Sequence, residues 1–174
     1  MLVTSECLLG SGFLTGYREE GKAEVVTAYN LIRCGAGKAK HKSEIVRIDG
    51  IAAEIRGADP QQDLLRLLVT LPTTATQIGI RTETSTGEPV FAVGSNPQGE
   101  RAVVTWGNVL LALPGQVTAK VQVMPGSSGG QLISAIDGAL LGMTVRADLG
   151  FADAVSGNVL LQFLDRTRNQ RVGA

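Results

Sequence analysis

The stretch MPGSSGG, Met124–Gly130, is the feature on which the prediction of the fold depends. It places Ser128 in a turn between Gly126 and Gly129. Glycine adopts backbone conformations that other residues avoid, so the N–H groups of such a turn can converge on one point. Converging N–H groups beside a hydroxyl group form an oxyanion hole. Turns rich in Gly and Ser are more often only turns, so this interpretation needs support from the rest of the chain.

Short apolar segments flank this turn on both sides and are separated by Gly, Pro, Asp and Asn. The 22 glycines among 174 residues are about twice the usual share. Many short strands without long intervening helices are typical of an all-β barrel or sandwich. The expected strands are Cys7–Leu14, Ala23–Ala28, Lys42–Asp49, Ile51–Ile55, Leu64–Val69, Pro89–Val93, Arg101–Val109, Gln116–Val121, Gly130–Ser134, Ala139–Val145 and Gly150–Ala154.

One helix is predicted, over Gly157–Arg166. Ser156 can cap its first turn. Its apolar residues form a single stripe, which consists of Val159, Leu160, Phe163 and Leu164. Three arginines follow at its end, Arg166, Arg168 and Arg171. We expect a helix packed on a barrel with a solvated basic end, in preference to a basic docking tail.

Composition limits the classes of partner. Lys and Arg together number 16, as do Asp and Glu, so no charge excess favours nucleic acid or an anionic membrane. No apolar run approaches the ~18 residues of a membrane span, and the N-terminus has no signal-peptide pattern. These features predict a cytoplasmic protein, or one inside a virion or other assembly. No Cys or His cluster has metal-ligand spacing, so we expect no cofactor and no metal.

The two cysteines, Cys7 and Cys34, leave two alternatives open. A hairpin of Leu8–Thr15 and Ala23–Leu31, turning near Tyr17–Gly21, would bring them almost opposite each other. A disulfide would then be geometrically feasible. In a reducing compartment the same residues would be two buried thiols.

Six segments occur in an order that resembles the trypsin-like serine protease family, and within it the bacterial high-temperature-requirement branch. The resemblance covers Cys7 to Leu164 and rests on GSGFLTG (Gly10–Gly16), VVTAYNLI (Val25–Ile32), DPQQDLLRLLV (Asp59–Val69), EPVFAVGSNPQG (Glu88–Gly99), PGSSGGQLIS (Pro125–Ser134) and GALLGMTV (Gly138–Val145). It implies an all-β fold of two antiparallel six-stranded barrels with a C-terminal helix. Residues 1–174 would form one such domain, with barrels at about 1–75 and 76–155 and the helix at about 156–168.

The resemblance also implies roles for individual residues. Ser128 matches the nucleophile, and the N–H groups of Gly126 and Ser128 match the oxyanion hole. Asp63 matches the acid of the triad. The threonine-alanine-histidine motif of the family falls on Thr27, Ala28 and Tyr29, so Tyr29 stands where the family has its general base.

Three further positions concern binding. Gln122 matches the base of the specificity pocket and gives no strong charge preference. Thr144 and Val145 match the strand that pairs with a bound peptide by β-augmentation. Ser127 replaces the aspartate of secreted digestive relatives, so no activating ion pair with a processed N-terminus is expected.

A tyrosine at the position of the base would leave Ser128 without activation. Phenol has a pKa near ~10, so about one molecule in a thousand is phenolate at pH 7. The carboxylate of Asp63 would oppose that phenolate, because like charges repel. We therefore expect neutral Tyr29 to donate its O–H to Asp63.

Other bases are less favoured by the sequence. His41, the single histidine, lies in the polar stretch Gly35–Glu44, which is most simply a solvated loop. A serine–lysine pair would need a buried lysine. The candidates, none in a pattern of burial, are Lys38, Lys40, Lys42 and Lys120.

The sequence thus predicts a degenerate trypsin-like domain, a pseudoprotease, that binds a protein or peptide or serves a structural role. The chain would belong to a homo-oligomer or to a multiprotein assembly such as a virion. The alternative is an active serine endopeptidase that uses Ser128 with an unusual general base.

Overall fold

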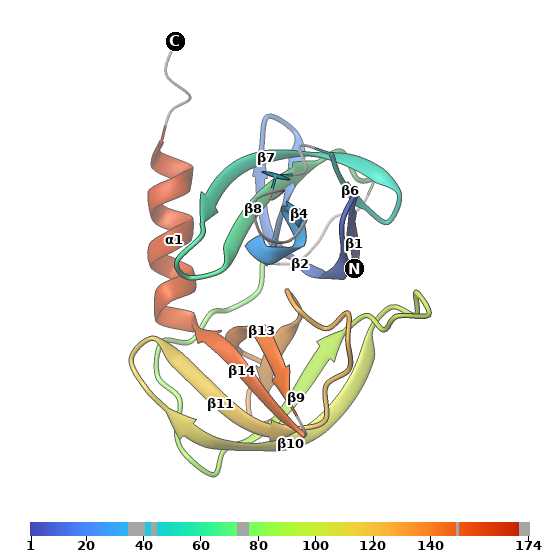
Figure 1. The fold of residues 1–174 in the computed structure, drawn as a ribbon. Helices are drawn as coiled ribbons and strands as arrows, with labels where there is room; N and C mark the ends of the chain where they lie inside the picture. Colours follow the sequence, from blue (N-terminus) through green and yellow to red (C-terminus); the bar gives the residue numbers. More distant parts are fainter. Residues whose placement is uncertain (35–40, 43–44, 73–76, 149, 171–174) are drawn as a thin grey trace.

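The computed structural model describes residues 1–34, 45–72, 77–148 and 150–170, together with the backbone of 41–42. These residues form two closed six-stranded antiparallel barrels and one C-terminal helix (Figure 1). The predicted fold class is therefore confirmed.

The first barrel is closed in the strand order β1-β2-β3-β8-β7-β6. Its strands are β1 (Leu2–Ser5), β2 (Leu9–Glu19), β3 (Lys22–Ala28), β6 (Val46–Ile48), β7 (Ile51–Asp59) and β8 (Leu64–Val69). Between β3 and β6 lie the 3₁₀ helix η1 (Tyr29–Ile32) and the two-stranded sheet of β4 (Arg33–Cys34) and β5 (His41–Lys42).

The second barrel is closed in the order β10-β11-β14-β13-β12-β9. Its strands are β9 (Pro89–Gly94), β10 (Val103–Ala112), β11 (Gln116–Val121), β12 (Gln131–Ser134), β13 (Leu140–Asp148) and β14 (Phe151–Ser156). The helix α1 (Gly157–Asn169) follows directly.

Strand β1 was not among the expected strands. Its four residues are too few for an alternating pattern to stand out from a sequence. It forms because β2 and β6 each need a partner: Val3 pairs with Gly10 on one side and with Ile48 on the other. Closure of the barrel, which is a tertiary event, therefore determines this element.

Each barrel is filled mainly by aliphatic side chains. The larger cluster fills the first barrel and continues through Leu140, Met143 and Leu160 into the interface with the second barrel and α1. The smaller cluster lies inside the second barrel, around Val109 and Leu132. The shared cluster holds the two barrels in a fixed relation, because separating them would expose this apolar surface.

Helix α1 begins at the top of the second barrel and runs upward beside the first (Figure 1). It packs against β7 and β8 of the first barrel and against β13 and β14 of the second. Ser156 caps it as predicted, because its Oγ accepts the N–H of Val159. The expected stripe is buried at Leu160, Phe163 and Leu164. Among the residues that the structure describes, no helix has the length and apolar character to cross a membrane.

The basic end of α1 is solvated only in part: Arg166 is 52% exposed, whereas Arg168 is bound to the first barrel. Arg168 donates to the fully buried Glu24 of β3, at 2.5 Å from Nη2 to Oε1. The same carboxylate accepts the Nε–H of Arg66, itself 1% exposed, at 2.6 Å. Arg166 pairs with Asp59 at the surface. These ion pairs attach the helix to the first barrel, and Arg171 lies outside the described residues.

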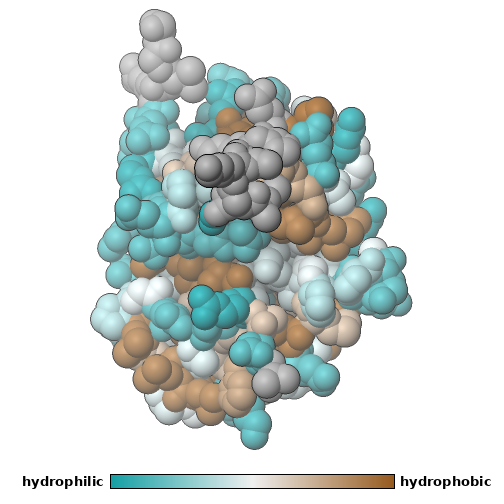
Figure 2. All heavy atoms as spheres, viewed as in Figure 1, coloured by the Kyte–Doolittle hydropathy of each residue, from teal (hydrophilic) through white to brown (hydrophobic). Residues whose placement is uncertain are grey.

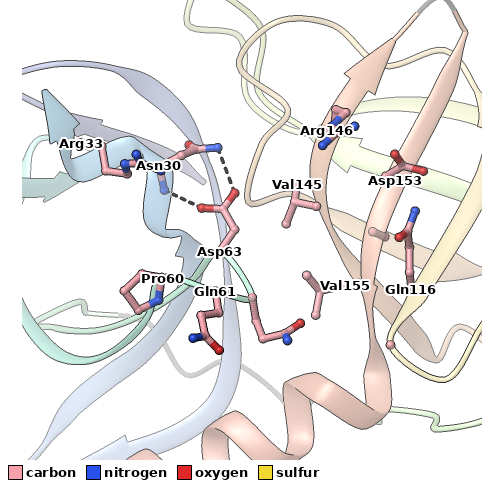
Figure 3. Close-up of a pocket in the computed structure, with 13 residues that line it drawn as sticks. Asn30, Arg33, Pro60, Gln61, Asp63, Gln116, Val145, Arg146, Asp153 and Val155 are labelled. Carbon is pink, nitrogen blue, oxygen red and sulfur yellow. Dashed lines mark hydrogen bonds between the residues drawn. The ribbon is translucent and has the colours of Figure 1, made fainter. Parts of the chain in front are cut away.

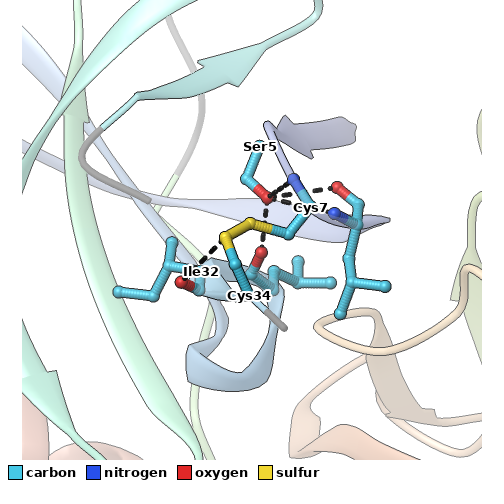
Figure 4. The surroundings of a disulfide bond; sticks show 6 residues. Ser5, Cys7, Ile32 and Cys34 are labelled. Atoms are coloured by element: carbon cyan, nitrogen blue, oxygen red, sulfur yellow. Dashed lines mark hydrogen bonds between the residues drawn. A yellow bond between two sulfur atoms is a disulfide. The ribbon is translucent and has the colours of Figure 1, made fainter. Parts of the chain in front are cut away.

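The hairpin of β2 and β3 forms, and a disulfide joins Cys7 to Cys34 with their Cα atoms 5.2 Å apart (Figure 4). The hydroxyl group of Ser5 supports this link, because it accepts the N–H of Cys7 at 3.0 Å and donates to the carbonyl oxygen of Leu31 at 2.5 Å. The turn before β2 is thereby fastened to the segment that follows η1.

We expect the Cys7→Ser/Cys34→Ser variant to lose about 3 kcal/mol of unfolding free energy. The disulfide closes a loop between residues 27 positions apart, and losing this constraint stabilises the unfolded chain. Urea denaturation of the variant beside the oxidised parent measures the difference. Equal midpoints would show that the link adds nothing to stability.

Hydrophobic side chains also reach the surface, and Figure 2 shows them on the lower barrel. Trp106 of β10 is 69% exposed and contacts Phe91 at 5.1 Å between ring centroids. Trp106 lies within the strand expected over Arg101–Val109, which forms as β10 at Val103–Ala112. The alternation of apolar residues in the sequence did not predict that its side chain points outward into solvent.

Candidate functional site

The predicted oxyanion turn has the geometry that its residues suggest. Ser127 N–H donates to Met124 O at 3.0 Å, and Gly126 has φ of 93°. Proline at the second position and a positive φ on glycine at the third define a type II turn. Within the described part of the chain, the N–H groups of Gly126 and Ser128 donate to no acceptor. They are therefore available to a carbonyl oxygen of a ligand.

Ser11 of β2 fastens this turn to the first barrel. It is 1% exposed, and its Oγ donates to Gly126 O at 2.6 Å while accepting the N–H of Ser95 at 2.7 Å. Its N–H donates to Ser128 O at 2.7 Å, and its carbonyl oxygen accepts the Thr27 hydroxyl at 2.5 Å. The GSGF motif thus positions the turn from the opposite barrel.

Gly129 is required where these groups meet. Its φ is 87°, and a Cβ there would lie 2.0 Å from Ser11 O and 2.6 Å from Thr27 Oγ1. Any other residue would push the turn away from β2. The glycines of MPGSSGG are therefore explained by close approach of two backbones as well as by turn geometry.

We expect Ser11→Ala to lower the unfolding free energy by about 2 kcal/mol, because the buried N–H of Ser95 loses its acceptor. Thermal and urea unfolding measure this change. The matched control is Ser95→Ala, whose hydroxyl makes one long bond of 3.3 Å to Met1 O. Equal losses in both variants would contradict a special role for Ser11.

The acid position, Asp63, is held by Asn30. Asn30 N–H donates to Asp63 Oδ1 at 2.7 Å, and Asn30 Nδ2–H donates to Asp63 Oδ2 at 3.0 Å. Tyr29 N–H donates to the main-chain oxygen of Asp63 at 3.0 Å, which continues the β3–β8 ladder by one residue. Burial raises the pKa of Asp63 and outweighs the opposing effects of Asn30 and Arg33.

The expected hydrogen bond from the Tyr29 hydroxyl to Asp63 is not formed in the described structure, where Asn30 is the side chain that donates to both carboxylate oxygens. Tyr29 is 4% exposed and belongs to the hydrophobic core of the first barrel. In η1, Tyr29 and Asn30 are adjacent, so their side chains point in different directions. The 3₁₀ turn directs Tyr29 into the core and Asn30 to Asp63.

A cavity of about 480 Å³ opens between the barrels beside these residues (Figure 3). The first barrel contributes Asn30, Arg33 and Asp63, and the second contributes Gln116, Val145, Arg146, Asp153 and Val155. Of the site residues predicted from sequence, Asp63 and Val145 meet here. Ser128, although described, lies outside this lining, on the turn before β12.

The strand β13 offers a partly free edge to this cleft. Its pairing with β12 ends at Met143, whereas its pairing with β14 continues to Asp148. Thr144 closes that edge locally, since its N–H donates to Gly130 O and its O accepts Gly129 N–H. Val145 and Arg146 follow, at a β-bulge. A peptide strand could add beyond Thr144.

Gln122 is not in this cleft. It borders a cavity of about 10 Å³ with Ser127 and Thr144, which has room for about one water. It also borders an open hollow of about 710 Å³ with Trp106 and Lys120. Its role at the base of a specificity pocket stays a prediction.

The structure describes only some of the residues considered as alternative bases. His41 pairs through its backbone with Cys34, while its side chain and those of Lys38, Lys40 and Lys42 lie outside the described residues. Lys120 is exposed on β11, in the hollow beside Trp106. In the described ranges, no group of three His, Cys, Asp or Glu could hold a metal ion.

The sequence profile of the trypsin-like peptidase domain matches residues 10–143. The chain belongs to this family. The match spans both barrels and contains Asn30, Asp63 and Ser128. The finer resemblance to the high-temperature-requirement branch stays a prediction.

Solved structures agree with the trypsin-like fold. The inactive form of Rv3671c from M. tuberculosis H37Rv, crystallised as a serine-to-alanine mutant, has a TM-score of 0.74 and 23% identity, covering 99% of this chain and 88% of that chain. A second inactive form, of Rv3671c protease, has a TM-score of 0.73 and 21% identity, covering 95% and 87%. No curated protein matches this chain. At this identity the likeness concerns the fold.

Asn30 is the site residue that the sequence analysis missed. It is next to Tyr29, and its amide is a good donor to a carboxylate. The sequence contained a signal for Asn30. Moving the alignment with the histidine motif of the family by one residue places Asn30, and not Tyr29, at the position of the histidine. Only the hydrogen bonds to Asp63 decide between the two residues.

Proposed function

We propose that this trypsin-like domain binds peptide segments in the cleft between its barrels and does not cleave them efficiently. The observation that supports this proposal is the pairing of Asn30, in place of a histidine, with Asp63.

In a Ser-His-Asp triad, imidazole donates one N–H to the aspartate and uses its other nitrogen to take the proton of the serine. Asn30 performs the first of these tasks through Nδ2–H. It cannot perform the second, because the remaining group of the amide is a carbonyl oxygen, which is a very weak base. Loss of the base in a comparable triad lowers kcat by about a million-fold.

Two features of the site support peptide binding. The N–H groups of Gly126 and Ser128 are available to a carbonyl oxygen, and β13 has a partly free edge beyond Thr144. Both features suit an extended peptide. A site that has these features and, among the described residues, pairs its acid with an amide in place of a base favours binding over cleavage.

A fluorophosphonate probe tests the first half of the proposal. The unmodified chain should remain unlabelled under conditions that label an active serine protease fully, as should Ser128→Ala. Labelling of the unmodified chain at Ser128, together with hydrolysis of a peptide substrate, would favour the alternative of an active endopeptidase. Binding of an extended peptide, measured by fluorescence anisotropy, tests the second half.

The partner identity and the role in an assembly are predictions from sequence. Native mass spectrometry of material from its source would test them. A discrete homo-oligomer, a monomer or a large particle such as a virion would each give a distinct mass.

A further inference from the structure

Two arginines in the cleft have no hydrogen-bond or ion-pair partner among the described residues. Among the described arginines, Arg33 and Arg146 alone have a guanidinium group without a hydrogen bond or ion pair. Each of the others binds a carboxylate or a main-chain oxygen. The two unpaired groups line the same cavity.

Arg33 and Arg146 come from opposite walls of the cleft. Arg33 is on β4 of the first barrel, beside η1, and Arg146 is on β13 of the second barrel (Figure 3). Both are exposed. A ligand that lies between the barrels would therefore pass between two cations that no neighbour neutralises by contact.

The acidic residues of the cleft accept hydrogen bonds from uncharged donors. Asp63 accepts two hydrogen bonds from Asn30. Asp153, which faces Arg146 across β13 and β14, accepts the hydroxyl of Thr118 at 2.7 Å. Neither carboxylate forms an ion pair with Arg33 or Arg146 at contact distance, which leaves both guanidinium groups free to bind a ligand.

We propose that the cleft binds acidic peptide segments, in which carboxylate side chains pair with Arg33 and Arg146. A guanidinium group presents a planar fork of donors that matches a carboxylate. Arg146 lies just beyond Thr144, where the edge of β13 can pair with an added strand. Alternate side chains of that strand share one face, so acidic residues two positions apart can face the cleft together.

This inference rests on the proposed peptide-binding function and adds the class of ligand. The test uses three fluorescein-labelled hexapeptides that alternate threonine with glutamate, with glutamine or with lysine. Fluorescence anisotropy at low salt should show the glutamate peptide binding about tenfold more tightly than the glutamine peptide. The lysine peptide should bind most weakly, and 0.5 M salt should remove most of the difference.

Substitutions assign the effect to the two arginines. Arg33→Gln and Arg146→Gln should each weaken binding of the glutamate peptide about fivefold, and more than they weaken binding of the glutamine peptide. The matched control is Arg47→Gln, which removes the same charge at an exposed arginine bonded to Gly50 O at 3.4 Å, outside the cleft lining. It should leave all three affinities unchanged.

The outcomes separate the two proposals. Equal binding of the glutamate and glutamine peptides, or equal effects of all three substitutions, would overturn the acidic preference and leave peptide binding intact. Binding of none of the three peptides would overturn both proposals. Tightest binding of the lysine peptide would show that the carboxylates of the cleft, and not its arginines, select the ligand.

Discussion

Replacing Asn30 by histidine is expected to make Ser128 reactive. An imidazole at this position can donate to Asp63 as the amide does and offer its second nitrogen to the serine hydroxyl. The oxyanion turn already has its N–H groups available. We expect fluorophosphonate labelling at Ser128 and an increase of about 10³-fold in peptide hydrolysis. This is part of the roughly million-fold that a base supplies in a complete triad.

Mass spectrometry of the labelled peptide, together with the initial rate of hydrolysis, measures this gain. The matched control is Tyr29→His, one residue earlier. It should stay unreactive and lose stability, because Tyr29 lies in the core of the first barrel. The double variant Asn30→His/Ser128→Ala should show no labelling. Reactivity in Tyr29→His and not in Asn30→His would contradict the assignment of Asn30 to the position of the catalytic histidine.

The second large effect concerns Glu24, which is fully buried between two arginines. We expect Glu24→Ala to lower the unfolding free energy by about 4 kcal/mol. It would leave Arg66, 1% exposed, without its buried partner, and removing one member of a buried ion pair typically costs 3–5 kcal/mol. It would also release Arg168 of α1. Urea unfolding measures the loss, and the contacts of α1 should be lost first.

An exposed ion pair provides the control for this variant. Glu54 of β7 pairs with Lys22 and is 48% exposed. Glu54→Ala should change stability far less than Glu24→Ala, since exposed pairs contribute little. Equal losses at Glu54 and Glu24 would show that burial of the ion pairs does not decide their effect.

The same cluster predicts how stability depends on pH. Burial alone would raise the pKa of Glu24, but hydrogen bonds from Arg168, Thr15 and Arg66 outweigh burial and lower it below its ordinary value of 4.5. The unfolded chain therefore binds a proton at Glu24 before the folded chain does. The stabilisation is complete above about pH 4.5 and is lost as pH falls through the lower, folded-state pKa. Glu24→Gln should flatten the acid limb of a stability profile, which urea midpoints between pH 3 and 7 would record.

Much of the fold was predictable because its signals are local. The strands Leu64–Val69 and Gln116–Val121 were predicted with the observed bounds, since runs of apolar residues between turn residues indicate strands. Ser156 and the apolar stripe of α1 identified the helix in the same way. The type II turn at Met124–Ser127 follows from proline and glycine in adjacent positions.

The sequence by itself thus determined most strands, the helix and the turn that presents Ser128, because each depends on neighbours along the chain, while the two-barrel arrangement was expected from the family resemblance. Only the tertiary structure decided which of two adjacent residues, Tyr29 or Asn30, meets Asp63. It alone also brought Arg168 to Glu24, which is 144 positions away in the chain. Both pairings depend on how η1 and α1 pack against the closed barrel. The burial that stabilises these pairings exists only after the barrel has formed.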